Sequence, residues 1–407
     1  MSQQGPIIVV STAGRAPFAA ALEDAKLFPI IDAAWHDAAR AVARLQPGAV
    51  LVEMSESTEP AFSALAEQVA ARQPYLPLIA IDPRTMLPEN AMPFSSSGGR
   101  FDRLAARLSA ALRVRSLHAT VMRRLKDELA APSNTDPIRD ATVLLIGRGA
   151  TYPALSVSLG QRMGIVGALS IEAAAKHLNV RDVNGIVLGE GFSRRVMDAF
   201  LTVLAEDARF RNLPVVVTSD ELAPDYGLPI LVIISGSPSY IAANASPLIR
   251  QHALEAQLSR RLRSIDAGGL LDPGTGLLTP AAFDRDFATA IFQTQSRGGG
   301  LSVARFAFDP DHPRAQLDGG RILSRLMRQM DFGVVRDDGS VVVAFADADL
   351  RTAHMIARRL SSVMRHTSHG DGDSRTEPVV TVASMQPSDS AKSLLARLYT
   401  QTRRAAS

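Results

Sequence analysis

An arginine and an aspartate stand three residues apart at Arg328 and Asp331, a short step ahead of an acidic segment at residues 337–341. The planar guanidinium of arginine binds a phosphate, or the O6/N7 edge of guanine, through two parallel hydrogen bonds. A carboxylate accepts hydrogen bonds from ligand donors. On a helix the same two residues would instead form an i,i+3 ion pair, which contributes only a few tenths of a kcal/mol. The pair therefore fits either a ligand-recognition site or an ordinary surface contact.

The surrounding sequence resembles the GGDEF domain of bacterial diguanylate cyclases. In that family a product-binding Arg-x-x-Asp motif lies five residues before the signature Gly-Gly-Asp/Glu-Glu-Phe. The segment 271–283, with its Asp-Pro-Gly-Thr-Gly turn, resembles the turn that opens the same domain. Counted without gaps, the five signature positions hold Asp337, Asp338, Gly339, Ser340 and Val341. An aspartate pair would repel the phosphates that pass there, and the metal-binding glutamate of the family is absent.

Two further catalytic segments differ from the family pattern. Phe308 stands where the first strand should carry a metal-binding aspartate. The guanine-gripping segment is shortened, with Gln316 in place of a histidine and Gly320 in place of an aspartate. Asp309 and Asp311 would supply one metal ligand at most, which does not replace three losses. The resemblance therefore implies a domain with no catalytic residues, no bound metal and no cofactor.

The product-binding positions of the family are retained. The resemblance places cyclic di-GMP against Arg328 and Asp331, with the arginine on guanine or phosphate and the aspartate on the Watson–Crick edge. The family takes a second arginine from a later helix, and the gapless count puts Arg359 there, next to Arg358. We therefore expect these residues to form a cyclic di-GMP site.

Upstream of this region, the chain repeats one pattern twice. Short apolar runs alternate with segments of helical periodicity, which is typical of parallel sheets covered by helices on both faces. The predicted strands are 7–10, 49–52, 78–81, 141–146, 185–188, 213–217 and 230–234. The predicted helices are 38–45, 61–71, a long one at 104–129 and another from about 247 to 262. The Pro-rich stretch 131–137 is predicted to be a linker, and the polar segment 366–374 a loop rather than a metal site.

The fold class is therefore α/β. We predict two doubly wound, receiver-like (flavodoxin-like) domains at residues 1–130 and 138–262. A degenerate GGDEF-type α+β domain with a central, mostly antiparallel sheet follows at residues 263–407. This arrangement resembles that of PleD-type response regulators, which carry a receiver, a receiver-like adaptor and a cyclase domain.

The two receiver-like domains lack the groups that phosphotransfer needs. A working receiver has an aspartate nucleophile after its third strand and an acidic pair after its first strand to hold Mg²⁺. Here the third strand ends in Glu53, and the first strand is followed by Ser11 and Thr12. Glu53 is either a permanent mimic of phosphoaspartate or, as we favour, a solvent-facing carboxylate. These domains are expected to serve dimerisation or docking.

Composition restricts the class of protein. A chain of 407 residues predicts two to four domains, and a net charge of +3 argues for neither nucleic acid nor a membrane surface. The absence of cysteine excludes a disulfide framework and thiol catalysis and fits a reducing compartment. No apolar run approaches the roughly 20 residues that span a bilayer. We therefore expect a cytoplasmic protein.

The leading hypothesis is an inactive cyclase relative, similar to PopA-type effectors, that binds cyclic di-GMP. It would form a homodimer and act on a protein partner that the sequence does not identify. Two alternatives stay open: an active diguanylate cyclase with unorthodox metal ligands, and a scaffold that binds no nucleotide.

Overall fold

The computed structural model describes residues 5–12, 14–24, 29–54, 59–83, 85–96, 101–125, 136–218, 226–364 and 377–405. The chain divides into two compact units. The first consists of Met1–Met163, Ala168–Ala174 and Val183–Leu258, and the second of Gly164–Gly167, Ala175–Asp182 and Ser259–Ser407. The three domain boundaries proposed from sequence stay a prediction. Most of the predicted linker, 131–135, and the polar segment 366–374 lie outside the described residues.

The first sheet has the strand order β2-β1-β3-β4-β5, and all its neighbouring strands are parallel. Its strands are β1 (Ile7–Ser11), β2 (Ile30–Ala34), β3 (Ala49–Glu53), β4 (Leu78–Ile81) and β5 (Ala91–Phe94). This order is the flavodoxin-like 2-1-3-4-5 arrangement. The three strands predicted from continuous apolar runs are confirmed. The two edge strands escaped prediction, because β2 is half-exposed and contains Asp32, and β5 contains Pro93.

Helices cover this sheet on both faces. They are α1 (Ala19–Asp24), α2 (Trp35–Leu45), α3 (Glu59–Ala70) and α4 (Leu104–Arg124). Val42 of α2 and Phe62 and Leu65 of α3 pack with Ile8 and Val50 of the sheet in one hydrophobic core. Burying one such large side chain stabilises the folded state by about 1.5–3 kcal/mol, which is why these apolar runs specify the fold.

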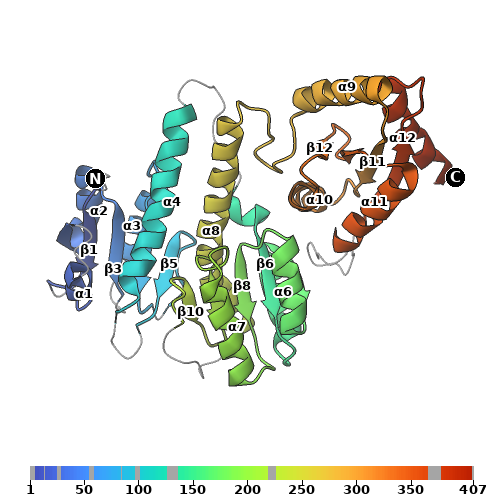
Figure 1. Ribbon diagram of the computed structural model, residues 1–407. Coiled ribbons are helices and arrows are strands. Elements are labelled where there is room, and N and C mark those ends of the chain that lie inside the picture. Colours follow the sequence, from blue (N-terminus) through green and yellow to red (C-terminus); the bar gives the residue numbers. More distant parts are fainter. Residues whose placement is uncertain are drawn as a thin grey trace. The chain divides into compact units, whose positions relative to one another are not determined.

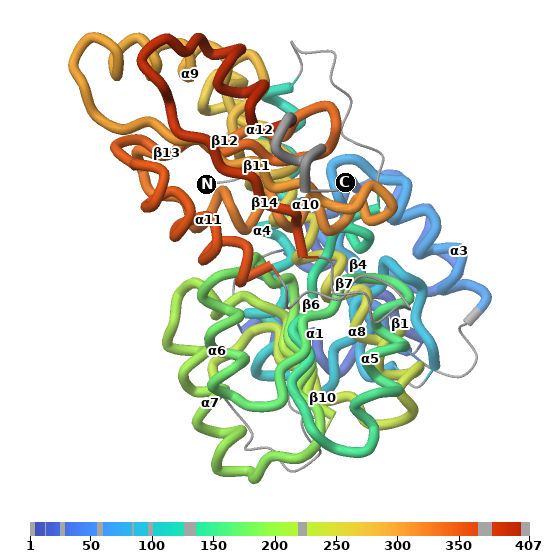
Figure 2. The backbone as a smooth tube through the Cα atoms, turned by 90° about the vertical axis from the view of Figure 1, so that its right-hand side faces the viewer, coloured from blue at the N-terminus to red at the C-terminus, as the bar shows by residue number. Residues whose placement is uncertain are grey.

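The second sheet has the order β10-β9-β8-β6-β7, which in chain order is the same flavodoxin-like arrangement. Its strands are β6 (Thr142–Ile146), β7 (Gly164–Ala168), β8 (Gly185–Leu188), β9 (Val215–Val217) and β10 (Leu231–Ile233). The helices are α5 (Tyr152–Gly160), α6 (Ile171–Val180), α7 (Arg194–Glu206) and α8 (Pro238–Asp266), preceded by the 3₁₀ turn η2 (Pro137–Asp140). In Figure 2, α6 and α7 lie on one side of β6 and α5 and α8 on the other. The mixed α/β class with parallel sheets is thereby confirmed.

Helix α8 corrects one prediction. It begins at Pro238, not near Pro247, and carries Pro247 in its interior. The sequence predicts a helix that starts at this proline, because a proline inside a helix normally breaks the backbone hydrogen-bond ladder. In Figure 1, α4 and α8 run alongside each other, and an ion pair of 2.9 Å joins Arg113 of α4 to Glu255 of α8. No helix of the described chain is long and apolar enough to cross a membrane.

The second unit contains a four-stranded sheet of order β12-β13-β11-β14 in which every pairing is antiparallel. The strands are β11 (Leu301–Ala307), β12 (Phe332–Val335), β13 (Val341–Ala346) and β14 (Val379–Ser384). The helices are α9 (Pro280–Arg297), α10 (Pro313–Leu326), α11 (Leu350–Met364) and α12 (Ala391–Ala405).

Side chains alternate between two cores along this sheet. Val341 and Val343 of β13 face a core shared with α10 and α11. Val342 and Ala344 face a second core, shared with α9 and α12. A strand with both faces covered is apolar at every position, which explains the unbroken run at residues 341–345. The loops at the ends of β12 and β13 therefore stand on a rigid frame.

Candidate functional site

The Arg-x-x-Asp segment forms a turn between α10 and β12. Helix α10 ends at Leu326, and the Asp331 N–H donates to the Arg328 carbonyl over 3.0 Å. The interpretation of this pair as an i,i+3 ion pair on a helix is therefore wrong. The Asp331 side chain is therefore positioned by a tertiary contact instead of by helical geometry.

Asp331 ties this turn to the neighbouring strand. The residue is only 8% exposed, and its Oδ1 accepts from the Ala346 N–H at the end of β13 over 3.2 Å. Its Oδ2 is buried and has no hydrogen-bond partner within the described chain. Burial raises the pKa of Asp331, and hydrogen bonds from the Ala346 and Arg328 backbone together with the Arg328 charge offset part of that rise. One acceptor is thus used structurally and the other is unused.

Arg328 and Arg359 are both exposed. Within the described residues, the Arg328 side chain makes no hydrogen bond or ion pair, although its charge acts on Asp331. Arg359 lies on the outer side of α11, whose inner side buries Ala353, Ala357 and Leu360. Helices α10 and α11 pack into the same core. The structure therefore brings Arg328 and Asp331 together in one turn. Arg359 lies on a helix of the same layer, and among the described residues it makes no hydrogen bond or ion pair with them.

Residues 337–341, which the sequence resemblance aligns with the family signature, form the turn of the β12–β13 hairpin and the start of β13. The Arg336 N–H donates to the Ser340 carbonyl, and the Gly339 N–H donates to the Arg336 carbonyl, both over 2.8 Å. Gly339 has a φ of +77°, a conformation that glycine adopts without a steric penalty. A Cβ at this position would lie 2.0 Å from Nε2 of Gln316, so that side chain packs directly on the turn.

Arg305 is the residue of this region that the sequence analysis missed. From strand β11 its guanidinium donates to Asp338 Oδ2 over 2.8 Å and to Ser340 Oγ over 3.1 Å. It also lies 4.7 Å from the ring centroid of Tyr399. An arginine within an otherwise apolar strand was the available signal. A fixed cation of the protein thus stands beside a signature carboxylate.

The charge of Asp338 is satisfied locally. Burial raises its pKa, but hydrogen bonds from Ser340 and Arg305 outweigh burial and hold the pKa below its ordinary value. Its Oδ1 accepts from both the N–H and the Oγ–H of Ser340. Hydrogen bonds reach both carboxylate oxygens of Asp338. This arrangement favours a role of Asp338 in closing the hairpin over a role as a metal ligand.

A pocket of about 550 Å³ lies beside the hairpin, lined by Asp272, Thr275, Gln316, Arg336 and Asp337 among others. Asp272 accepts from the hydroxyl of Thr275 over 2.6 Å. Arg336 is paired with Asp284 over 2.8 Å and lies over the ring of Phe283. The pocket walls therefore carry two carboxylates and one cation that is already paired, which is a poor match for a triphosphate.

The other acidic residues singled out from sequence are not clustered. Asp309 contacts the ring of His312 and accepts from the Asp311 N–H, which makes it part of a local turn. Glu53 is half-buried at the end of β3 and is paired in register with Ile81 of β4. In the described part of the chain, no three carboxylate or histidine groups gather closely enough to hold a metal ion. Whether Glu53 mimics phosphoaspartate stays a prediction.

No family model matches this chain, and no curated protein matches it. Among solved structures, it is similar to the coiled coil and GGDEF domain of DgcB from Caulobacter crescentus in complex with c-di-GMP. The identity is 15%, the TM-score is 0.28, and 35% of this chain and 84% of that chain are covered. A sensory box/GGDEF family protein from Caulobacter crescentus CB15 is 20% identical, with a TM-score of 0.28, covering 34% of this chain and 97% of that chain.

The FimX GGDEF domain from Pseudomonas aeruginosa is 18% identical, with a TM-score of 0.28, covering 32% of this chain and 90% of that chain. About a third of the chain is thus similar to GGDEF domains.

Proposed function

We propose that residues 263–407 form a degenerate GGDEF domain that binds cyclic di-GMP and does not make it. In this proposal Arg328, Asp331 and Arg359 hold the ligand. The protein is a cytoplasmic, homodimeric effector, and the ligand-bound state acts on a protein partner. Residues 1–130 and 138–262 are receiver-like domains that serve dimerisation and docking without taking up a phosphoryl group.

The observation that carries the ligand site is the unsatisfied state of the Arg-x-x-Asp turn. A buried carboxylate oxygen without a donor is costly, and a ligand N–H that reaches it recovers that cost. Beside it, the exposed Arg328 is free of competing ion pairs within the described chain. An exposed, unpaired arginine beside a buried acceptor oxygen that lacks a donor is a feature of a recognition site.

Support for lost catalysis comes from the hairpin. Cyclisation of GTP needs metal ions bound by carboxylates, and a backbone that lets phosphates approach. Asp338 is engaged by Arg305 and Ser340, and Asp337 adds a second negative charge at the turn. Phe308 occupies the position of the expected metal-binding aspartate and packs against Gly319. These three features oppose the chemistry at once.

Titration calorimetry of the full chain with cyclic di-GMP tests this proposal. We expect saturable binding that Arg328→Ala and Asp331→Asn each weaken about 10- to 100-fold, since each removes a hydrogen bond that involves a charged group. Arg297→Ala is a matched control, because Arg297 is an exposed arginine at the end of α9, outside the proposed site. Arg359→Ala tests the third member separately.

Two outcomes would contradict the proposal. Formation of cyclic di-GMP from GTP and Mg²⁺ by the purified protein would make it a cyclase with unorthodox metal ligands. Absence of any binding heat, at protein concentrations where micromolar affinity is measurable, would leave a scaffold that binds no nucleotide. Sedimentation at equilibrium tests the homodimer, with twice the mass of one chain expected.

A further inference from the structure

A buried arginine without a partner lies in the first compact unit, far along the chain from the site described above. Arg107, in the first turn of α4, is 2% exposed. Its Nε and both terminal nitrogens are buried, and none has a hydrogen-bond partner within the described residues. Its electrostatic partners are Tyr75 and Arg103, and neither is a carboxylate.

An isolated guanidinium in this position is expensive. Burial lowers the pKa of Arg107 to about 10, a value that already includes an opposing rise from Tyr75 and a smaller decrease from Arg103. At neutral pH a group with that pKa is still protonated. Burial also raises the pKa of Tyr75, so the phenol stays neutral and is no counter-ion. A buried charge that lacks both a counter-charge and hydrogen bonds costs several kcal/mol. Such a site calls for an anion.

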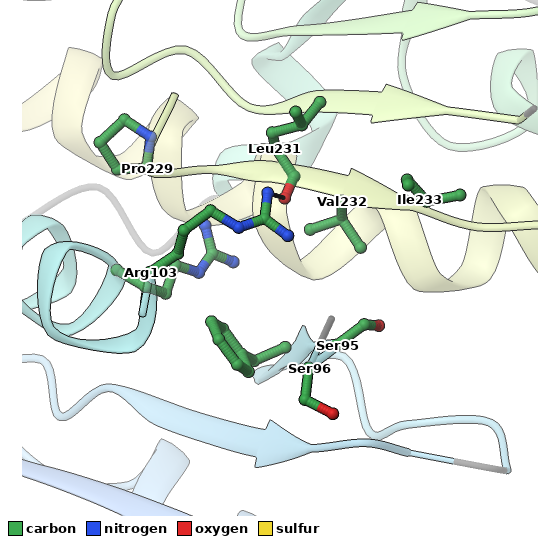
Figure 3. A pocket seen from close by; sticks show the side chains of 9 residues that line it. Ser95, Ser96, Arg103, Pro229, Leu231, Val232 and Ile233 are labelled. Carbon is green, nitrogen blue, oxygen red and sulfur yellow. Dashed lines mark hydrogen bonds between the residues drawn. The ribbon is translucent and has the colours of Figure 1, made fainter. Parts of the chain in front are cut away.

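The guanidinium lies beside a pocket of about 210 Å³ between the edge strands of the two parallel sheets. Figure 3 shows Arg103 projecting between Leu231 and Val232 of β10 on one side and Ser95 and Ser96, which follow β5, on the other. Arg103 donates to the Leu231 carbonyl over 3.4 Å. Two arginines from the start of α4 thus line one small cavity.

The remaining walls divide into a polar rim and an apolar side. The Ser96 hydroxyl donates to Asp82 over 2.8 Å, so this serine is already engaged. Ser95 is exposed at the rim. Phe94, Leu231 and Val232 supply apolar surface. The volume equals that of roughly seven water molecules, taking about 30 Å³ for each. That is room for a phosphoryl group and a few carbon atoms.

We propose that this pocket is an anion site that binds inorganic phosphate or a small phosphomonoester through Arg103 and Arg107. A phosphomonoester carries a charge of about −1.5 to −2 at pH 7, which matches two guanidinium groups. Arginine forks bind phosphate oxygens in a bidentate manner. The positive end of the α4 dipole lies in the same place and adds to the attraction.

Because β5 belongs to the first sheet and β10 to the second, a bound phosphate would join the two sheets. Its binding is independent of the cyclic di-GMP site. A full-length protein that fails to bind cyclic di-GMP can still show this second site.

Thermal unfolding of the full chain tests the inference, with inorganic phosphate and glycerol phosphate compared against chloride at matched ionic strength. We expect a saturable rise in Tm with at least one of the two phosphates. Arg107→Met should abolish that rise. Without phosphate this variant should unfold at the same or a higher temperature than the wild type, because an unpaired buried charge has been replaced by an apolar chain of similar length.

A second variant keeps the test valid if Arg107→Met does not fold. Ser95→Asp places a carboxylate at the exposed rim, where it repels the anion without disturbing a core. Ser109→Asp is its control, since Ser109 is exposed on the same helix but does not line the pocket. We expect loss of the phosphate response in the first variant and its retention in the second. A wild type that responds to phosphate no more than to chloride overturns the inference, and so does a response that Arg107→Met retains.

Discussion

At the scale of single residues, Asp331 carries two requirements that a substitution can separate. Its Oδ1 holds the backbone of Ala346, and its Oδ2 is the acceptor assigned to the ligand. The raised pKa means that the folded state binds a proton more tightly than the unfolded state does. The folded state is therefore favoured at acidic pH, and this advantage is lost as the pH rises through the folded pKa.

Asp331→Asn removes the buried charge and keeps an oxygen for the Ala346 N–H. At pH 7 we expect a denaturant midpoint equal to or above that of the wild type, together with weakened binding of cyclic di-GMP. The stability of the wild type relative to the variant should increase as the pH falls through the raised pKa of Asp331 toward the ordinary value of 3.8. Urea unfolding monitored by circular dichroism measures both effects. A variant that loses stability at neutral pH would show that Asp331 is mainly structural.

Asp338 shows the opposite dependence of stability on pH. Its pKa is depressed in the folded state, so its ionised form stabilises the fold above the ordinary pKa of 3.8 and loses this contribution as the pH falls below that value. Because the carboxylate is partly exposed, we expect Asp338→Asn to cost only about 0.5–1 kcal/mol at pH 7.

The difference between Asp338→Asn and the wild type should shrink as the pH falls below the ordinary carboxyl pKa of 3.8, because the depressed pKa delays protonation of Asp338 in the folded state. Asp337→Asn is the matched control from the same turn, and as an exposed substitution it should change stability by less than about 0.5 kcal/mol at pH 7. Equal effects of the two variants would show that the pair of Asp338 with Arg305 does not stabilise the hairpin.

At the scale of elements, the β12–β13 hairpin depends on Gly339. Its positive φ disfavours any residue with a Cβ, and the nearby Gln316 adds a steric demand. Gly269, which follows α8, has a similar φ of +75° but has no atom within 4 Å of a built Cβ. The two glycines thus separate backbone strain from crowding.

We expect Gly269→Ala to cost about 1 kcal/mol from φ alone. Gly339→Ala should cost more, and the double variant Gly339→Ala/Gln316→Ala should return to the cost of the Gly269 variant once the cost of Gln316→Ala alone is subtracted. Chemical denaturation of the four variants gives the comparison. If Gly339→Ala costs no more than Gly269→Ala, the Gln316 side chain moves freely and does not brace the turn.

At the scale of the whole molecule, the chain combines two flavodoxin-like parallel sheets with one antiparallel sheet. The edge where a receiver would take a phosphoryl group offers Ser11, Thr12 and Glu53, and Ser11 Oγ donates to the Gly14 carbonyl. With no acidic pair there to hold Mg²⁺, the proposed input is the bound ligand and not phosphorylation.

Incubation of the full chain with acetyl phosphate and Mg²⁺ should therefore leave its intact mass unchanged, because neither the nucleophile nor the metal ligands are in place. A receiver protein with a complete acidic site serves as the positive control. A stable adduct of one phosphoryl group on either receiver-like domain would contradict the proposed role and restore a response-regulator mechanism.

The amino-acid sequence was enough to predict many of the buried strands and to show which residues stand at the positions of the family signature. Unbroken apolar runs such as residues 7–10 and 341–345 specify strands buried on both faces, and substitutions at Phe308 and 337–341 are visible without coordinates. Edge strands β2 and β5 were invisible because half-exposed or proline-containing strands have no such run. The predicted start of α8 lay near Pro247 instead of Pro238, because prolines are common at the start of a helix and rare in its interior.

The state of the charged groups depends on tertiary contacts. The contact of Asp331 with Ala346, the pairing of Arg305 with Asp338, and the burial of the unpaired Arg107 all depend on residues distant in the chain. The sequence shows which residues are charged, but it does not show whether they are buried or paired. Burial and pairing determine the energetic cost of each charged group. The spacing from Arg328 to residues 337–341 indicated the family resemblance, and with it the ligand to be tested. The fold decided which polar groups are left without partners, and therefore where ligands are expected.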